Sequence, residues 1–378
     1  MAKTGQQWGP AAAFLWPALA FAAVAEASSA VARELAGMAL QPRERAEPYQ
    51  AWTTAHDVGL ELGSVRLRDF SVGADGPATL ICAPYALHGA TIADFAPRHS
   101  LVEALRGAGV GRLGVTDWRS ATPAMRDFSI DTYLADLNVL VDHVGAPVNL
   151  LGLCQGGWLA LMYAARFPRK VRKLVLAGAP VDIAAGDSFL SRAVAAAPPA
   201  FFRELVRLGE GRVLGERLFE TWCPGIPGPD EVRDLLQPSA AIDDQAFAQL
   251  LARFDAWYRT AVDLPGRYYL EAVEQLFRAN ALARGRFVAL GQQLDLKAVR
   301  TPIYLLVALR DELVAPQQVL AAEALVGTPL PDLAKSTLPC RHLSLFMGRD
   351  VLAQTWPRIA AWLLAPPSTD IEPVQSAA

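Results

Sequence analysis

The distribution of apolar residues predicts strands that alternate with helices along most of the chain. Segments of strand length that are rich in apolar residues occur at residues 79–83, 111–116, 148–151, 173–177 and 302–309. Helical patterns lie between them, for example at residues 100–106 and from Asp131, the expected N-cap, to about His143. This alternation favours an α/β fold with a mostly parallel sheet and helices on both faces.

The same pattern divides the chain into five parts. A hairpin-like alternation at Leu60, Val65 and Leu67 begins the core, and a long insertion interrupts the core after residue 183. The predicted parts are an N-terminal helix and linker (1–45), a core in two portions (58–183 and 286–364), a cap (184–285) and a disordered tail (365–378).

The predicted cap lacks the regularly recurring strand patterns of the core. Helical and proline-rich pieces with frequent aromatic residues replace it, for example at Trp257 and Tyr258. Because an insertion between two late strands of such a sheet usually covers the active site, we expect a mobile cap whose aromatic side chains line an acyl tunnel.

The N-terminal apolar run at residues 11–25 supports two interpretations. It resembles a secretory signal, with Lys3 before it and small residues after it. Pro17 interrupts the run, however, and the helical pattern continues to Met38, which favours an apolar or amphipathic helix that docks on a hydrophobic surface. We expect this helix to be dispensable for catalysis.

A cysteine lies at the sharpest predicted turn of the chain. The apolar run 148–151 leads into Gly152, Cys154, Gln155, Gly156 and Gly157, and a helical pattern then continues to the Phe-Pro pair at 167–168. In α/β-hydrolases such a strand-turn-helix carries the nucleophile, and its glycines avoid side-chain collisions. A thiol at the start of a helix ionises readily, so Cys154 is the predicted nucleophile.

The other members of a catalytic triad follow from chain order. In this fold an acid and then a histidine follow the nucleophile, each after a strand. Asp311 follows the run 302–309, and His342 follows a further short strand. The remaining histidines all precede the cysteine: His56, His88, His99 and His143. Asp182 is the alternative acid, but its position suits a tether for the start of the cap.

Backbone N–H groups are expected to form the oxyanion hole. In this fold one donor follows the nucleophile and another lies in the loop after an earlier strand. These rules nominate Gln155 and the Leu87–His88 region. We assign the His88 side chain a structural or pocket-lining role because the loop donates through its backbone.

Composition narrows the class of protein. The 378 residues are 52% hydrophobic and 19% charged, which is sufficient for a large core. A net charge of -3 argues against nucleic acid as a partner. The four cysteines lack CxxC spacing, so no metal site is predicted and a reducing compartment is the simplest interpretation. Cys82, inside an apolar run, is expected to be a core thiol.

Three motifs together are more specific than the triad order alone. They are the cysteine box from Gly152 to Gly157, the Leu264-Pro265-Gly266 element with Tyr269, and the segment from Asp311 to Pro316. With their flanking residues, they resemble the poly(3-hydroxyalkanoate) synthase family, particularly its shorter two-component members. The resemblance covers residues 60–363.

This resemblance implies a cysteine acyltransferase that acts on 3-hydroxyacyl-coenzyme A. The acyl group and the growing polyester would be held as thioesters on the residue matching Cys154, with Asp311 as the acid and His342 as the base. Coenzyme A would enter with the substrate and leave as product, and no separate cofactor is implied. The resemblance also implies a cytoplasmic protein at polyester granules, as a homodimer or with a second synthase-type subunit.

Two residues beside the triad depart from the family pattern. Such synthases usually carry a histidine directly after the acid, where this chain has Glu312. They also carry a glycine directly before the catalytic histidine, where this chain has Arg341. A carboxylate and a guanidinium at these positions would change the local charge and the access to the tunnel. We expect this to affect polymerisation more than covalent catalysis.

Two other functions therefore stay open at the level of sequence. The same triad could hydrolyse polyester, oligomer or hydroxyacyl thioester, as an intracellular depolymerase or a thioesterase does, because only the second nucleophile differs. A catalytically idle granule-surface or partner-binding protein is the third interpretation. Identification of the products formed from 3-hydroxybutyryl-coenzyme A separates all three.

Overall fold

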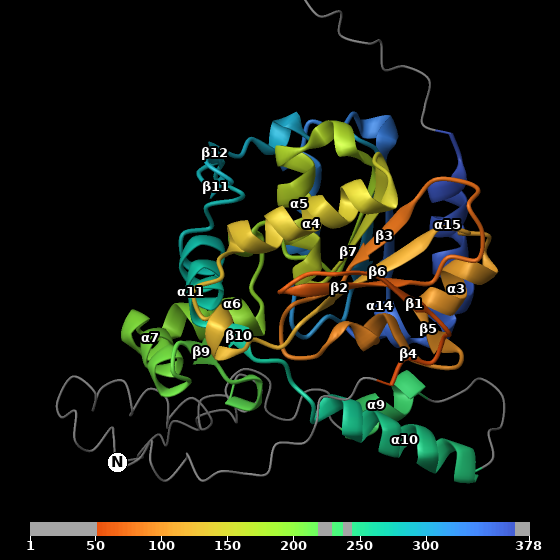
Figure 1. The fold of residues 1–378 in the computed structure, drawn as a ribbon, viewed down its shortest axis with the longest axis horizontal. Coiled ribbons are helices and arrows are strands. Elements are labelled where there is room, and N and C mark those ends of the chain that lie inside the picture. Colours follow the sequence, from red (N-terminus) through yellow and green to blue (C-terminus); the bar gives the residue numbers. More distant parts are fainter. Residues whose placement is uncertain (1–50, 218–228, 237–243, 367–378) are drawn as a thin grey trace, which may run out of the picture.

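An eight-stranded sheet forms the centre of the structure, a computed structural model that describes residues 51–217, 229–236 and 244–366 (Figure 1). In spatial order its strands are β1 (Asp57–Glu61), β2 (Val65–Asp69), β6 (Leu113–Trp118), β3 (Thr79–Cys82), β7 (Val148–Leu153), β8 (Val171–Ala177), β13 (Ile303–Ala308) and β14 (Leu333–Leu338). Neighbours from β6 to β14 pair in parallel, whereas β2 is antiparallel to both β1 and β6. The expected parallel sheet and its initial hairpin are confirmed.

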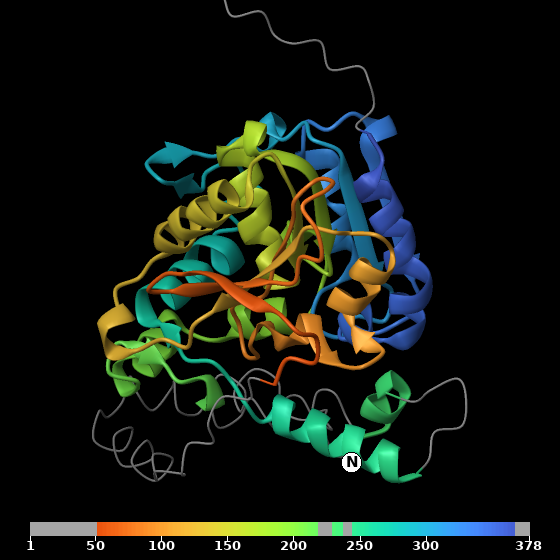
Figure 2. The same cartoon turned by 45° about the vertical axis from the view of Figure 1, so that its right-hand side comes forward.

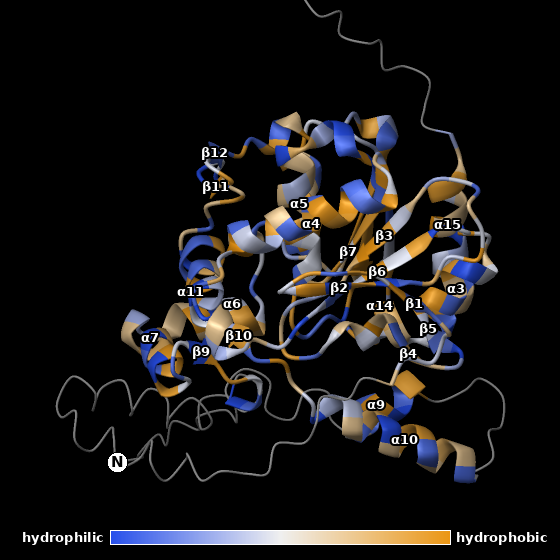
Figure 3. Cartoon of the chain, viewed as in Figure 1, coloured by the Kyte–Doolittle hydropathy of each residue, from blue (hydrophilic) through white to orange (hydrophobic). Residues whose placement is uncertain are grey.

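Helices cover both faces of this sheet because successive strand residues point to opposite sides. Leu80 and Leu150 pack on one side with residues of α4 (Ile130–Val144) and α5 (Gln155–Arg166). Ile81 and Leu151 pack on the other side with α3 (Leu101–Gly107) and α15 (Trp356–Leu364). Figures 1 and 2 show the two helical layers on either side of the sheet. Figure 3 shows its central strands coloured mainly as hydrophobic.

Shorter elements complete the core. They are the pairs β4 (Asp94–Ala96) with β5 (His99–Ser100) and β11 (Val288–Ala289) with β12 (Gln292–Gln293), and the helices α12 (Pro316–Leu320), α13 (Ala322–Leu325) and α14 (Ser344–Met347). A π-helical turn, Val351–Thr355, leads into α15. Within the described residues, no helix is both long enough and apolar enough to cross a membrane.

The insertion between β8 and β13 is mainly helical, as the loss of strand rhythm indicated. Its described elements are α6 (Phe189–Ala196), α7 (Pro199–Leu208), β9 (Arg212–Val213), α9 (Pro229–Leu236), α10 (Asp244–Tyr258), β10 (Leu264–Pro265), α11 (Gly266–Glu271) and a π-helical turn (Ala272–Arg278). In Figure 1 α9 and α10 lie together below the sheet, and α7 lies apart from them, beside β9. Mobility of this segment and an acyl tunnel within it stay predictions.

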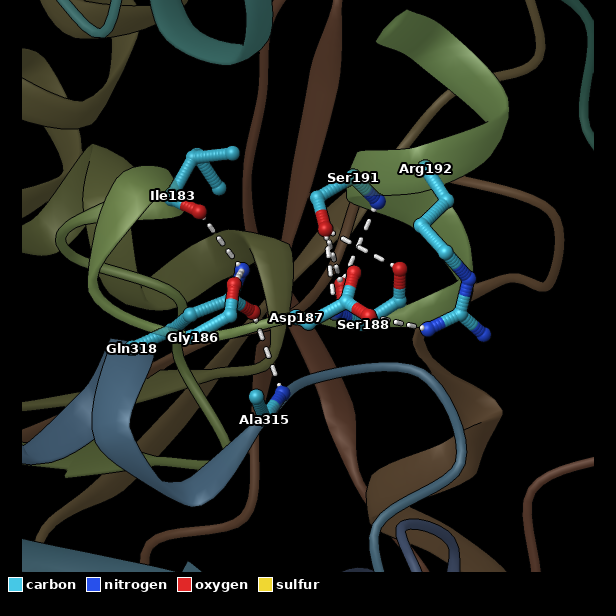
Figure 4. Close-up of polar contacts among 8 residues, drawn as sticks. All are labelled: Ile183, Gly186, Asp187, Ser188, Ser191, Arg192, Ala315 and Gln318. Carbon is cyan, nitrogen blue, oxygen red and sulfur yellow. Dashed lines mark hydrogen bonds and ion pairs between the residues drawn. The ribbon is translucent and has the colours of Figure 1, made fainter. Parts of the chain in front are cut away.

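One buried glutamine ties the start of the insertion to the loop after β13 (Figure 4). Gln318, on α12, donates from Nε2 to the carbonyls of Ile183 at 2.9 Å and Gly186 at 3.1 Å. Its Oε1 accepts the N–H of Ala315 at 3.0 Å. The side chain is 1% exposed, so these bonds form away from water and are costly to break.

Asp182 forms a second attachment at the same place. Its Oδ1 accepts the N–H of Ala184 at 2.9 Å and the side-chain amide of Asn280 at 2.6 Å. Because Asn280 lies at the far end of the insertion, Asp182 joins the start of that segment to its end.

Two details differ from the predicted elements. Asp131 does not cap α4; Ser129 does, because its hydroxyl accepts the N–H of Thr132 at 3.3 Å and the Thr132 hydroxyl accepts the Ser129 N–H at 3.1 Å. Asp131 lies in the first turn and accepts the N–H of Leu290 instead. Strand β6 ends at Trp118 and not at residue 116 as predicted, because Trp118 still pairs with Val65 at the start of β2. The predicted N-terminal helix and most of the predicted tail lie outside the described residues.

Candidate active site

The register of the parallel strands brings the predicted triad to one edge of the sheet. Leu153 at the end of β7 lies opposite Ala177 in β8, and Ala308 in β13 lies opposite Leu338 in β14. Cys154, Asp311 and His342 follow β7, β13 and β14 respectively. Carboxyl ends of parallel strands meet at the same edge, so residues distant in sequence converge there.

Cys154 occupies a strained turn between β7 and α5. Its φ is 49° and its ψ is -121°, a region that non-glycine residues rarely adopt. The Cys154 N–H donates to Ala177 at 2.8 Å, and its carbonyl accepts the Gly157 N–H at 2.9 Å. The backbone on both sides therefore fixes the strained residue in place.

The flanking glycines are required by close backbone approach. A Cβ on Gly152 would lie 2.4 Å from the Gly157 Cα, and one on Gly156 would lie 2.1 Å from the Cys82 carbonyl oxygen. A Cβ on Gly157 would lie 2.2 Å from the Ala179 Cβ. No side chain tolerates such distances, so the spacing of the box follows from helix-to-strand packing.

His342 is held by Asp311 and faces Cys154. Its Nδ1 lies 2.6 Å from Asp311 Oδ2, and both side chains are 2% exposed. Asp311 Oδ1 accepts the N–H groups of Leu313 at 2.9 Å and Val314 at 2.8 Å. Cys154 lies close enough to His342 to raise the pKa of its imidazole. With Nδ1 engaged by the carboxylate, Nε2 is left for the thiol.

The electrostatics of this group favour a protonated imidazole. Burial alone would lower the pKa of His342, but the negative charge of Asp311, the charge of Cys154 and hydrogen bonds to both raise that pKa well above its usual value. An imidazolium beside the sulfur stabilises a thiolate.

Packing restricts the imidazole further. A Cβ on Gly178, which has φ +57°, would lie 3.2 Å from the ring carbon Cε1. The Phe346 ring packs edge-on at a centroid distance of 5.4 Å. Gly178 was not predicted from the sequence, although a glycine directly after β8 was a signal that could have found it.

The two charged residues beside the triad have specific partners. Glu312 Oε2 accepts the backbone N–H of His342 at 3.3 Å. Arg341 forms an ion pair of 2.8 Å with Glu231 on α9 of the insertion. Thus Glu312 contacts the histidine loop, and Arg341 connects that loop to a helix of the predicted cap.

The predicted oxyanion loop is held by the end of α10 and the segment that follows it. Leu87 adopts a positive φ of 59°, and its carbonyl accepts the Val262 N–H at 2.7 Å. His88 Nδ1 donates to the Thr260 carbonyl at 3.2 Å, and its ring packs against Trp257 at a centroid distance of 4.2 Å with the planes tilted by 33°. Burial lowers the pKa of His88 to about 4. The neutral, packed ring matches the structural role expected for this side chain.

An aromatic cluster behind this loop was not predicted as a unit. Tyr85, Tyr133 and Tyr268 pack with centroid distances of 4.8 to 5.3 Å, and the hydroxyls of Tyr85 and Tyr133 lie 3.0 Å apart. Tyr268 belongs to the element that follows Leu264-Pro265-Gly266, which therefore attaches the insertion to the core.

The other described cysteines differ from Cys154. Cys82 is fully buried, and burial raises the pKa of its thiol far above the usual range. Burial also raises the pKa of Cys340 to about 11, with the charge of Asp311 as a further cause. Cys223 lies outside the described residues. Among the described residues, no group of histidine, cysteine or carboxylate side chains is arranged to hold a metal.

Comparison with known proteins identifies the fold family. A profile of the alpha/beta hydrolase fold matches residues 105–348. The crystal structure of BpoC from Mycobacterium tuberculosis, provisionally named a non-heme bromoperoxidase, superposes with a TM-score of 0.50 at 17% identity and covers 81% of this chain and 98% of its own. At that identity the likeness concerns the fold alone.

The names of related proteins place them in the family that the motifs resemble. The poly(3-hydroxyalkanoate) polymerase subunit PhaC of Allochromatium vinosum is 29% identical over 254 residues, which cover 65% of this chain and 70% of the relative. The subunit of that name from Haloferax mediterranei is 26% identical over 289 residues, covering 75% of this chain and 56% of the relative. The resemblance drawn from the motifs is confirmed by these relatives.

Proposed function

The chain belongs to the alpha/beta hydrolase fold family and is related to poly(3-hydroxyalkanoate) polymerase subunits, and from this premise we propose that it is a cysteine acyltransferase of the synthase type. Its proposed substrate is 3-hydroxyacyl-coenzyme A, and its proposed product is a polyester chain. Cys154 would carry the acyl group as a thioester, with His342 as base and Asp311 as its partner.

In the first half-reaction, the Cys154 sulfur, whose proton is already held by Nε2 of His342, attacks the thioester carbonyl carbon. The negative oxygen that develops accepts hydrogen bonds from the N–H of Gln155 and from the Leu87–His88 loop. When the intermediate collapses, the bond to the coenzyme A sulfur breaks, and that sulfur takes the proton from His342. Free coenzyme A leaves, and the acyl group stays on Cys154.

In the second half-reaction, the hydroxyl of another 3-hydroxyacyl unit attacks the Cys154 thioester. His342 takes the hydroxyl proton, the new ester bond forms, and the bond to the Cys154 sulfur breaks. The sulfur recovers the proton from His342. Each cycle lengthens the chain by one unit, whereas water in place of the hydroxyl would release a hydroxy acid.

The observation that carries this proposal is the 2.6 Å contact between His342 and Asp311, both buried, beside a cysteine at φ 49°. Strain of this kind persists only where surrounding structure enforces it, and it often marks a functional site. The related polymerase subunits supply the choice of substrate.

The proposal is tested with purified protein and 3-hydroxybutyryl-coenzyme A, with products separated by chromatography and identified by mass spectrometry. We expect coenzyme A and oligomeric ester to appear together, with an acyl group on the peptide that contains Cys154. The Cys154→Ala variant should lose turnover, on the order of 10⁶-fold where a triad acts as a unit, while it keeps its fold. Arg207→Gln, at an exposed ion pair on α7, is the matched control.

The alternative outcomes are equally specific. Coenzyme A released together with free 3-hydroxybutyrate identifies a hydrolase. Absence of coenzyme A release in the presence of folded protein contradicts catalysis on this substrate. Equal turnover by Cys154→Ala and wild type contradicts the assigned nucleophile.

A further inference from the structure

The ion pair between Arg341 and Glu231 joins the loop that carries His342 to a helix of the insertion. Arg341 Nη2 lies 2.8 Å from Glu231 Oε1, and the two side chains are 42% and 28% exposed. Arg341 directly precedes His342, whereas Glu231 lies in the first turn of α9. The related synthases usually carry glycine in place of Arg341, and glycine has no side chain that could form this contact. The contact therefore depends on a residue in which this chain departs from the family pattern.

The backbone on both sides of Arg341 is attached to the loop after β13. The Cys340 carbonyl accepts the N–H of Arg310 at 3.0 Å, and the His342 N–H donates to the Glu312 carboxylate at 3.3 Å. The second bond is longer than the usual value of about 2.9–3.0 Å and is correspondingly weak. The position of His342 is therefore sensitive to where the side chain of Arg341 is held.

The helix α9 also reaches the histidine loop through α14. The two helices are in contact, and Leu235 and Leu236 of α9 belong to the same buried apolar cluster as Phe346 of α14. The Phe346 ring packs edge-on against His342 at a centroid distance of 5.4 Å. The placement of α9 thus bears on His342 from both sides in the sequence, through Arg341 before it and Phe346 after it.

The helix α10 supports α9 against the core. The two helices are in contact and lie together below the sheet in Figure 1. Two rings of α10, Phe254 and Trp257, pack edge-on against Phe95 of the core at centroid distances of 6.0 and 5.9 Å. These three side chains are all buried, so α10 is firmly attached. An ion pair to α9 therefore ties the histidine loop to a supported element.

We propose that Glu231 and Arg341 are positioning residues that align His342 with Cys154 by tying the histidine loop to α9. When the pair is broken, the loop loses this attachment, the imidazole moves away from the sulfur, and less of the thiolate is stabilised. A half-exposed ion pair contributes little to the stability of a whole protein, so its effect should be local. The inference rests on the proposed roles of Cys154 and His342, but not on the identity of the substrate.

The test uses the full chain and two measurements that need no substrate. Hydrogen exchange resolved to peptides reports the opening of α9 and of the segment around His342. The thiolate fraction of Cys154 at about pH 7 is the ultraviolet absorbance lost when Cys154→Ala is introduced into the same chain. Glu231→Arg places two cations against each other, so exchange in both segments should become about fivefold faster or more, and the thiolate fraction should fall about twofold or more. Glu231→Gln, which only removes the charge, should change both in the same direction by less.

Reversal of both charges separates positioning from a general loss of structure. The double variant Glu231→Arg with Arg341→Glu again pairs opposite charges, and both measurements should return to within about twofold of wild type. Arg207→Gln, at an exposed ion pair on α7, is the matched control and should change neither.

Three results would overturn the inference while the proposed nucleophile and base stand. They are unchanged exchange of α9 in Glu231→Arg, faster exchange of α9 with an unchanged thiolate fraction, and a double variant no closer to wild type than Glu231→Arg. Absence of Cys154 thiolate in the wild type would overturn the pairing of Cys154 with His342 and this inference with it.

Discussion

Replacement of Asp311 by asparagine tests the tautomer of His342 directly. Asp311 Oδ1 accepts two backbone N–H groups, at 2.9 and 2.8 Å. If the amide of the introduced asparagine rotated, its NH₂ group would face these two donors and leave them unpaired, at about 1–3 kcal/mol each. The amide oxygen therefore stays where Oδ1 is now, and the NH₂ group must face His342.

The consequence is an imidazole in the wrong tautomer. Nδ1 would have to accept from the amide, which puts the proton of the neutral ring on Nε2, the nitrogen left for Cys154. His342 could then not take the thiol proton. The corresponding change in a serine protease triad lowers kcat by about 10⁴, and we expect a loss of about 10³–10⁴ here.

Alkylation of Cys154 measures the same effect without any assumed substrate. Loss of the Asp311 charge removes the largest cause that raises the pKa of His342, so less imidazolium stabilises the thiolate. The rate constant for iodoacetamide at about pH 6.5 should fall about tenfold or more. Peptide-resolved mass spectrometry separates Cys154 from Cys82 and Cys340.

Asp182→Asn is the matched control because Asp182 was the rival acid. It should weaken attachment of the insertion, where Asp182 binds Ala184 and Asn280, while Cys154 keeps its reactivity. Turnover and alkylation within threefold of wild type in Asp311→Asn, with a large loss in Asp182→Asn, would refute this reasoning.

Two further predictions concern packing and stability. His88 is neutral when folded because burial lowers its pKa to about 4, so between about pH 6.5 and pH 4 the unfolded chain binds a proton that the folded chain does not. The free energy of unfolding should therefore decrease as the pH is lowered through this range. Urea unfolding at about pH 7.5 and 4.5 should show a decrease that is roughly 2–3 kcal/mol larger in wild type than in His88→Gln. Gly156→Ala places a Cβ 2.1 Å from the Cys82 carbonyl oxygen, so we expect it to destabilise the protein by more than about 3 kcal/mol or prevent folding, whereas Gly107→Ala, with no atom within 4 Å, should change thermal stability little.

The sequence predicted features that depend on local pattern or on chain order. The strand-turn-helix at Cys154 has a local signature, because short buried strands and close glycine packing constrain neighbouring residues. The convergence of Asp311 and His342 was predictable since parallel strands end at one edge of a sheet. Each of these expectations depends on the fold class and needs no knowledge of side-chain positions.

Contacts between distant segments were beyond such reasoning. Nothing in the sequence links Arg341 to Glu231 or Gln318 to Ile183, because both contacts depend on how the insertion packs on the core. The error at Asp131 is different: Ser129 was present as a better cap, and the capping pair with Thr132 decided the boundary.

Glu312 offers a test that separates hydrogen bonding from charge. Its carboxylate accepts the backbone N–H of His342 at 3.3 Å. Because this hydrogen bond is long and the side chain is half-buried, its net contribution is about 1 kcal/mol. The groups that raise the pKa of His342 are Asp311 and Cys154. Glu312 therefore acts mainly by positioning the histidine loop.

Glu312→Gln keeps an oxygen acceptor and removes the charge, so the pH dependence of Cys154 alkylation should change little. Glu312→Ala removes the acceptor and should lower turnover about fivefold, as 1 kcal/mol implies, without moving the pH midpoint. Glu312→His, the residue usual in the related synthases, should behave like the alanine variant unless its ring also reaches the His342 N–H. A shift of the alkylation midpoint by more than about one pH unit in Glu312→Gln would show instead that the charge of Glu312 governs His342.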